Sequence, residues 1–163
     1  MTQTALASLM LAHNAGQTLQ QEFYSDPEIY KLEMEKIFLK SWLYVGHGSQ
    51  IPQRGDYFLF RMDSESVIII NNGNGQIRGL INVCRHRGSR LCSEAHGNEK
   101  LLVCRYHGWT YELDGALRGA GYAPAAIPTR EIFGVQEIKI AVKANPEKRK
   151  KPLKNFCIIS PTF

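Results

Sequence analysis

The chain of 163 residues is long enough to bury a core without disulfides, which indicates one domain or one domain with a tail. Its composition is that of an ordinary soluble globular protein, and it has no apolar run near the roughly 20 residues of a membrane span. The first residues lack the positive charge of a targeting peptide, so the four cysteines indicate metal ligands or free thiols, and we expect a cytoplasmic protein.

The net charge of +5 lies at the C-terminal end of the chain. Residues 139–163 carry seven Lys or Arg and one Glu, whereas residues 1–138 carry 13 basic and 14 acidic residues. A nucleic-acid-binding protein has its basic residues on the folded domain. We therefore expect no nucleic-acid partner, and the lack of a long apolar run leads us to expect no membrane partner.

The N-terminal part of the chain predicts a helix. Residues 1–22 have no strong hydrophobic period and indicate a weakly structured head. Ser25-Asp26-Pro27-Glu28 is a helix start, because Asp26 can cap the first turn and Pro27 suits it. A helix that ends near Ser41 should then pack on a core through the apolar residues Tyr30, Met34, Ile37 and Phe38.

From residue 42 onward, short strands and turns replace the helical period. Asn72-Gly73-Asn74-Gly75 and Asp114-Gly115 are turn sequences. Short strands joined by turns favour an antiparallel sheet or small barrel over a parallel α/β fold. The predicted fold is therefore mainly β with a leading helix. The predicted strands are 42–45, 57–61, 67–71, 76–83, 101–103, 110–113 and 138–142.

Two similar loops carry the candidate chemistry, Cys84-Arg85-His86-Arg87-Gly88 and Cys104-Arg105-Tyr106-His107-Gly108. Two thiolates and two imidazoles can bind one zinc ion or a 2Fe-2S cluster with both histidines on one iron. Structural zinc sites usually begin with two cysteines about two to four residues apart, whereas each loop here pairs a Cys with a His. The spacing favours the cluster over zinc, and the glycines permit turns that aim N–H groups at sulfur. The predicted ligands are Cys84, His86, Cys104 and His107.

The paired motifs Cys-Arg-His-Arg-Gly and Cys-Arg-Tyr-His-Gly-Trp-Thr-Tyr resemble the Rieske domain of Rieske-type non-haem iron oxygenase alpha subunits, the aromatic-ring-hydroxylating dioxygenases. The resemblance runs from about Phe23 to about Ile140. It implies a small antiparallel Rieske domain, a barrel or sandwich with two cluster-binding hairpin loops, over residues 23–142. The run Ser89–Glu94 is similar to the branch that demethylates betaine-like quaternary amines.

The resemblance also implies how the domain works. Cys84 and Cys104 would hold the inner iron and His86 and His107 the outer iron. The domain would take single electrons from a reductase or ferredoxin and pass them to a mononuclear iron. In the full-length protein its partners would include a catalytic domain or further copies of the chain.

Respiratory-chain Rieske proteins carry an extra Cys in each loop and a Ser after the second His-Gly. The corresponding positions here are Ser89, Tyr106 and Trp109. We therefore expect no loop disulfide, no hydroxyl donor to the cluster, and a reduction potential toward the low end of roughly −150 to +300 mV. Tyr106 and Trp109 should pack beside the site. The loop arginines should either face an acidic partner or be solvated; they are Arg85, Arg87 and Arg105.

The family binds its mononuclear iron with two histidines and a carboxylate in a separate domain. This sequence has no histidine after His107, so we expect it not to bind that iron or to hydroxylate alone. Residues 143–163 turn abruptly basic. We expect a disordered tail or a truncated or frameshifted product of a longer gene, with a docking arm for an acidic redox partner as the alternative.

Two other functions stay open from the sequence. One is a stand-alone Rieske ferredoxin-type electron carrier, which the helical head disfavours because such carriers usually begin near the first strand. The other is a zinc-binding interaction module without a redox role. The remaining histidines and cysteines are expected to be bystanders, with His96 at a loop tip; they are His13, His47, His96, Cys92 and Cys157.

Overall fold

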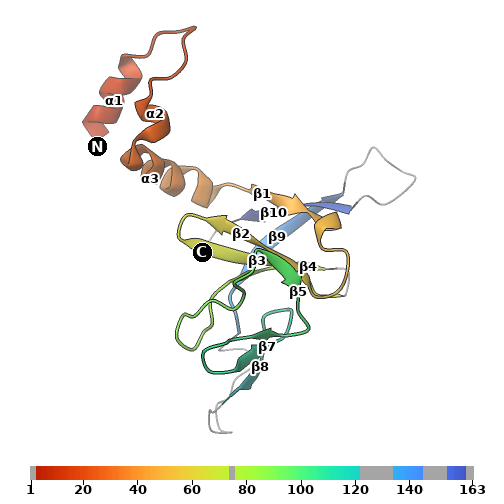
Figure 1. Ribbon diagram of the computed structural model, residues 1–163. Helices are drawn as coiled ribbons and strands as arrows, with labels where there is room; N and C mark the ends of the chain where they lie inside the picture. The colour runs from red at the N-terminus through yellow and green to blue at the C-terminus, as the bar shows by residue number, and fades with distance from the viewer. Residues whose placement is uncertain (1–2, 74–75, 122–133, 145–153, 161–163) are drawn as a thin grey trace. The chain divides into compact units, whose positions relative to one another are not determined.

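The computed structural model describes residues 3–73, 76–121, 134–144 and 154–160. It divides into two compact units, Met1–Trp42 and Leu43–Phe163. The first unit is helical and the second is built from antiparallel strands (Figure 1). The prediction of a mainly β protein with a leading helix is confirmed.

The first unit contains α1 (Gln3–Leu11), α2 (Glu22–Ser25) and α3 (Pro27–Lys36), followed by the 3-10 turn η1 (Phe38–Lys40). The predicted start of α3 is confirmed. The Asp26 carboxylate accepts from the N–H groups of Glu28 at 2.8 Å and Ile29 at 3.3 Å, and Pro27 occupies the first turn.

The predicted apolar face of this helix is not buried in the structure. Tyr30, Ile37 and Phe38 are exposed, and Ile29 is the buried residue of α3. The prediction was wrong because a unit of this size has too little apolar surface to cover a whole helix face.

The second unit contains a seven-stranded and a three-stranded sheet, in which every strand pair is antiparallel. A 3-10 turn, η2 (Gly48–Gln50), follows the first strand. The larger sheet has the order β1 (Leu43–His47), β10 (Lys154–Ser160), β9 (Glu137–Ala144), β4 (Ile77–Ile81), β3 (Glu65–Asn71), β2 (Asp56–Met62) and β5 (His96–Asn98). The smaller sheet has the order β6 (Leu102–Val103), β7 (Trp109–Tyr111) and β8 (Leu117–Ala120).

Strand β3 is buried on both faces and organises the core. Ile68 and Ile70 belong to one buried cluster, and Val67 and Ile69 belong to another. This division follows from the alternation of side chains along a strand. The first cluster contains residues of both sheets and includes Cys84 and Cys104. The packing that holds the two sheets together therefore also surrounds the candidate site.

Three strands were not predicted from the sequence: β5, β8 and β10. His96 lies in β5, paired with Phe58 of β2, and not at a loop tip. His-Gly-Asn has little strand preference, so the partner strand decides its conformation.

The expected tail contains a strand as well. Lys154–Ser160 forms β10 between β1 and β9, so this part of the expected disordered tail is a strand in the structure. Its Phe-Cys-Ile-Ile sequence favours a strand once a neighbour is available. Residues 145–153 and 161–163, and residues 74–75 of the predicted turn, lie outside the described part of the chain. In the described part, no helix has the length and apolar character to cross a membrane.

Candidate metal centre

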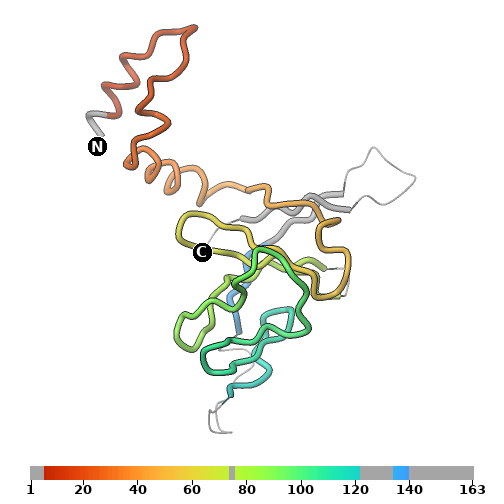
Figure 2. Tube along the Cα trace, viewed as in Figure 1, coloured from red at the N-terminus to blue at the C-terminus, as the bar shows by residue number. Residues whose placement is uncertain are grey.

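The two motif loops have the same backbone geometry. In each, the cysteine N–H donates to the carbonyl five residues later, and the glycine N–H donates back to the cysteine carbonyl. Gly88 and Gly108 adopt φ values of 74° and 71°, a region that glycine enters without strain. Figure 2 shows the two loops side by side in the β unit. The N···O distances of these hydrogen bonds are 2.8 Å for Cys84–Ser89 and Cys104–Trp109, and 2.9 Å for Gly88–Cys84 and Gly108–Cys104.

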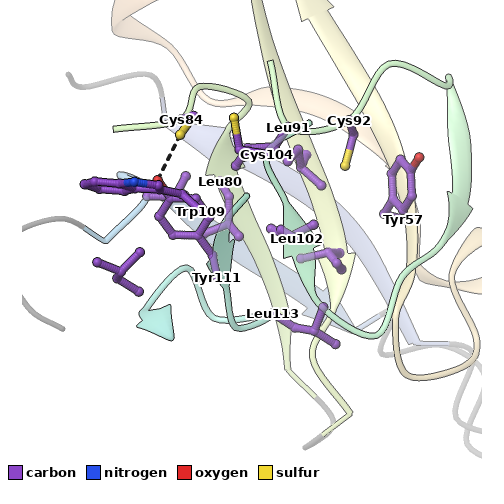
Figure 3. Close-up of a cluster of buried hydrophobic side chains, with 14 residues drawn as sticks. Tyr57, Leu80, Cys84, Leu91, Cys92, Leu102, Cys104, Trp109, Tyr111 and Leu113 are labelled. Carbon is purple, nitrogen blue, oxygen red and sulfur yellow. Dashed lines mark hydrogen bonds between the residues drawn. The ribbon is translucent and has the colours of Figure 1, made fainter. Parts of the chain in front are cut away.

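The two loop cysteines form a buried pair. The side chains of Cys84 and Cys104 are 1% and 2% exposed, and their sulfur atoms interact with one another. Figure 3 shows them next to each other, while Cys92 lies apart beside Tyr57. The structure thus brings together two sulfurs that are 20 positions apart in the sequence.

The two loop histidines form a second pair. The rings of His86 and His107 have centroids 4.7 Å apart at an interplanar angle of 69°, and both are half-buried. The Nδ1 atom of each ring is buried and has no hydrogen-bond partner in the structure. Leaving a buried polar atom unsatisfied costs about 1–3 kcal/mol. Two such nitrogens side by side indicate a shared partner that is not a protein group.

Each histidine packs against an aromatic ring. Trp109 stacks on His86 with centroids 4.8 Å apart and planes 5° apart. Tyr106 covers His107 with centroids 3.8 Å apart and an angle of 30°. The prediction that these two aromatic residues pack beside the site is confirmed. They hold the imidazole rings in orientation.

The surroundings favour the metal-binding form at Cys104 and His86 and oppose it at Cys84. Burial raises the pKa of the Cys84 thiol. Burial also opposes ionisation of Cys104, but the backbone N–H groups of Tyr106 and His107 outweigh it and lower the pKa of that thiol. Burial and the neighbouring His107 lower the pKa of His86. Neutral imidazoles and thiolates that accept N–H groups are the forms that bind metals.

Tyr111 supplies a hydroxyl that the sequence analysis missed. Its side chain is fully buried, and its Oη lies 3.1 Å from Cys84 Sγ and accepts from the Arg85 N–H at 3.2 Å. Burial raises the pKa of Tyr111, so the hydroxyl keeps its proton and can donate a hydrogen bond to the Cys84 sulfur when that sulfur is a thiolate.

The expectation that no hydroxyl reaches the site is therefore corrected. Trp109 occupies the position of the respiratory-chain serine, but Tyr111 hydrogen-bonds a cysteine sulfur from two residues further along. The alternation of buried residues in β7 places Trp109 and Tyr111 on the same face. The alternation of apolar and polar residues in Trp109-Thr110-Tyr111 was the feature of the sequence that could have predicted this placement.

The donor set fits a two-iron cluster better than a single ion. A structural zinc ion needs four protein donors that converge on one point. The candidate donors occur as a sulfur pair and an imidazole pair. This is the division of ligands that a Rieske cluster requires.

The other sequence candidates lie away from these pairs. Cys92 is buried but hydrogen-bonds Tyr57. His47 caps η2 by accepting from the Ser49 N–H. His96 is exposed in β5. In the described part of the chain, these three side chains therefore belong to neither the cysteine pair nor the histidine pair.

Comparison with known proteins agrees with this geometry. Residues 41–139 match the family described as the Rieske 2Fe-2S domain. The chain is 44% identical over 117 residues to the glycine betaine monooxygenase oxygenase subunit of Chromohalobacter salexigens, covering 72% of this chain and 26% of that protein. It is 41% identical over 110 residues to the biphenyl 2,3-dioxygenase subunit alpha of Rhodococcus jostii, covering 68% and 24%.

A solved structure extends the likeness to the fold. Naphthalene 1,2-dioxygenase from Rhodococcus sp., bound to indole, superimposes with a TM-score of 0.79 at 28% identity. The match covers 97% of this chain and 34% of that one.

The chain belongs to the Rieske 2Fe-2S domain family. Within this family it is a Rieske domain of the oxygenase alpha-subunit type, since the relatives named above are oxygenase subunits. The family's cofactor is the Rieske cluster, which disfavours the zinc-binding alternative. The chain spans about a quarter of the length of the curated relatives that it matches.

Proposed function

We propose that Cys84 and Cys104 bind one iron of a Rieske cluster and that His86 and His107 bind the other. The observation that carries this proposal is the pair of buried Nδ1 atoms without partners beside a pair of buried thiols. Backbone N–H groups and the Tyr111 hydroxyl aimed at the sulfurs support it. When bound, the cluster stores and releases one electron at a time.

The cysteines and the histidines of the site differ in how far they are buried. Cys84 and Cys104 are enclosed by the core cluster, which keeps water from the thiolates. His86 and His107 are half-buried and therefore form the more solvent-accessible side of the site. Trp109 and Tyr106 limit the rotation of the two imidazoles.

We propose that the domain serves an oxygenase by relaying electrons from a reductase or ferredoxin to a mononuclear iron. The relatives named as glycine betaine monooxygenase and biphenyl dioxygenase subunits support this role. Arg85, Arg87 and Arg105 are exposed on the two loops and suit an acidic donor protein. We place this function in the cytoplasm, where thiols stay reduced, and Cys84, Cys92 and Cys104 form no disulfide.

The test is chemical analysis and electron paramagnetic resonance (EPR) of the purified full chain, reconstituted with ferrous iron and sulfide if necessary. We expect about two iron atoms and two acid-labile sulfides per chain, and a signal from the reduced protein. Cys84→Ser and His107→Cys should alter or abolish that signal.

Matched variants of residues outside the proposed ligand set serve as controls. Cys92→Ser and His96→Gln change the same residue types and should leave the spectrum as it is. Unchanged g-values in both ligand variants would contradict the proposed ligands. Zinc without sulfide in the wild-type chain would contradict the cluster.

A further inference from the structure

The two ligand loops are closed at their bases in different ways. The Cys104–Gly108 loop connects β6 and β7, which pair through Leu102–Tyr111 and Val103–Thr110. The Cys84–Gly88 loop follows β4, but the returning segment at Leu91-Cys92 lies outside the strands. Backbone hydrogen bonds between paired strands therefore close the base of the second loop, whereas among the described residues the base of the first loop has no such strand pairing.

The side chain of Asn82 takes the place of that strand pairing. Its Oδ1 accepts from the N–H groups of Leu91 at 3.0 Å and Cys92 at 2.9 Å. Its Nδ2 donates to the Cys92 carbonyl at 2.7 Å. One amide thus makes three hydrogen bonds to the backbone at the point where the loop returns.

Asn82 is itself anchored to the core strand β3. Its Nδ2 also donates to Ser66 Oγ at 3.1 Å, and its backbone N–H donates to the Ser66 carbonyl at 2.9 Å. Both residues are buried, and Asn82 is 0% exposed. Every donor and acceptor site of the amide is used, which holds the side chain in a single orientation.

We propose that Asn82 is a positioning residue for the metal centre: it sets the place of the Cys84–His86 ligands relative to the Cys104–His107 ligands. This inference rests on the proposed function. Asn82 precedes Cys84 by two residues, and its bonds to Leu91 and Cys92 join the start of the first ligand loop to its end. The second loop needs no such residue because its strands pair directly.

The expected consequence of losing this amide is a displaced first loop. Asn82→Ala leaves the N–H groups of Leu91 and Cys92 and the Cys92 carbonyl without their partner, and both residues are buried. Substitution of residues that orient metal ligands lowers metal affinity about 10- to 100-fold. We expect Asn82→Ala to lose its cluster about 10 times faster than the wild type or more, with altered g-values and reduction potential.

The experiment compares the full chain with four variants. Asn82→Asp keeps the two acceptor bonds and removes the donors to the Cys92 carbonyl and to Ser66 Oγ. Ser66→Ala removes only the anchor hydroxyl. Ile69→Ala removes a fully buried side chain of the other core cluster and controls for lost stability. Each chain is measured for cluster loss, EPR g-values, reduction potential and thermal stability.

Hydrogen–deuterium exchange of the cluster-free chains supplies a measurement that does not depend on the cofactor. We expect faster exchange in Asn82→Ala confined to residues 84–92, with residues 104–109 unchanged. Ser66→Ala should show weaker effects of the same kind, and Ile69→Ala should lose stability while keeping the wild-type spectrum. If Asn82→Ala does not fold, Asn82→Asp decides by the same measurements.

Wild-type cluster retention, g-values and loop exchange in the Asn82 variants, with reduced stability alone, would overturn the positioning role. Failure of the wild-type chain to bind a cluster would instead contradict the proposed function. In that case the exchange measurement still tests the role of Asn82. Equal exchange rates of residues 84–92 in the wild type and in Asn82→Ala would overturn the inference.

Discussion

The Tyr111 hydroxyl and the Cys84 sulfur lie 3.1 Å apart although 27 positions separate the two residues in the sequence. Tyr111 comes from β7 of the smaller sheet, and Cys84 follows β4 of the larger one. The fold thus places a proton donor from one sheet on a candidate ligand attached to the other. This contact bears directly on how readily the site accepts an electron.

Replacing Tyr111 with Phe should make the reduction potential more negative. The hydroxyl stabilises electron density on sulfur, and this density is greatest in the reduced cluster. A hydrogen bond worth about 0.5–1.5 kcal/mol corresponds to about 20–60 mV for a one-electron couple. A redox titration followed by EPR measures the shift. Tyr57→Phe removes another buried hydroxyl and should leave the potential unchanged; equal potentials for wild type and Tyr111→Phe would refute the assignment.

The loop glycines should differ in what they tolerate. Gly88→Ala should lose about 1–2 kcal/mol of unfolding free energy, because its φ of 74° is unfavourable for a side chain although the space around it is open. Gly88→Asn should lose less, since Asn tolerates this region. Gly119→Ala, with open space and no positive φ, is the neutral control.

Gly121 should be far more sensitive than Gly88. A Cβ at Gly121 would collide with the backbone carbonyl of His107, so alanine there requires either the second ligand loop or the chain at residue 121 to move. We expect Gly121→Ala to lose iron during purification under conditions in which Gly88→Ala retains it. Urea unfolding and iron analysis of both variants provide the comparison, and equal iron content would argue against the close approach.

Cys92 should make the protein less stable at high pH. Burial, followed by the charge of Glu99, raises the pKa of the Cys92 thiol from 9.0 to about 11. The folded state then holds its proton more tightly than the unfolded state. This contribution is complete below about pH 9 and is lost as the pH rises toward 11, by up to about 3 kcal/mol at 1.36 kcal/mol per pH unit.

Denaturant unfolding at several pH values between 8 and 11 measures this loss. Cys92→Ala should flatten the decline between pH 9 and 11. The decline that remains should come from the other groups whose pKa burial raises, which are Cys84, Tyr111 and Tyr57, the last from 10.0 to about 12. An identical pH profile in wild type and Cys92→Ala would exclude the thiol as its source.

Asp26 should stabilise the first unit through its helix cap. Asp26→Ala removes the acceptor for the N–H groups of Glu28 and Ile29 and should cost about 1 kcal/mol, whereas Asp26→Asn should keep most of the cap. Amide exchange across α3 measures the change, and the EPR spectrum serves as the control. Unchanged exchange in Asp26→Ala would show that the cap contributes nothing.

Local patterns predicted much of the secondary structure. The cap at Asp26 was predictable because its bonds reach only two and three residues along the chain. Strands β2 and β3 contain runs of β-branched and aromatic residues, and these residue types favour a strand on their own. By contrast, β5 and β10 form because neighbouring strands offer them hydrogen bonds, and their place in the sheet has no signature in the segment itself.

The exposed apolar residues of α3 show a related restriction. Helical spacing predicts which residues share a face, but not whether another part of the molecule covers it. Tyr30 and Ile37 share the predicted face, yet the structure buries Ile29 instead. Burial depends on the packing partner, which periodicity does not describe.

By itself, the sequence predicted the four candidate donor side chains and determined the shape of each loop, because the cysteines, histidines and glycines of each loop lie within five consecutive positions. Only the tertiary structure decided that the two cysteine sulfurs lie together and that the Nδ1 atoms of the two imidazoles are buried. It also decided that Tyr111 and Asn82 make hydrogen bonds at this site. These relationships join residues 9 to 27 positions apart. Their geometry depends on how two sheets pack around one core.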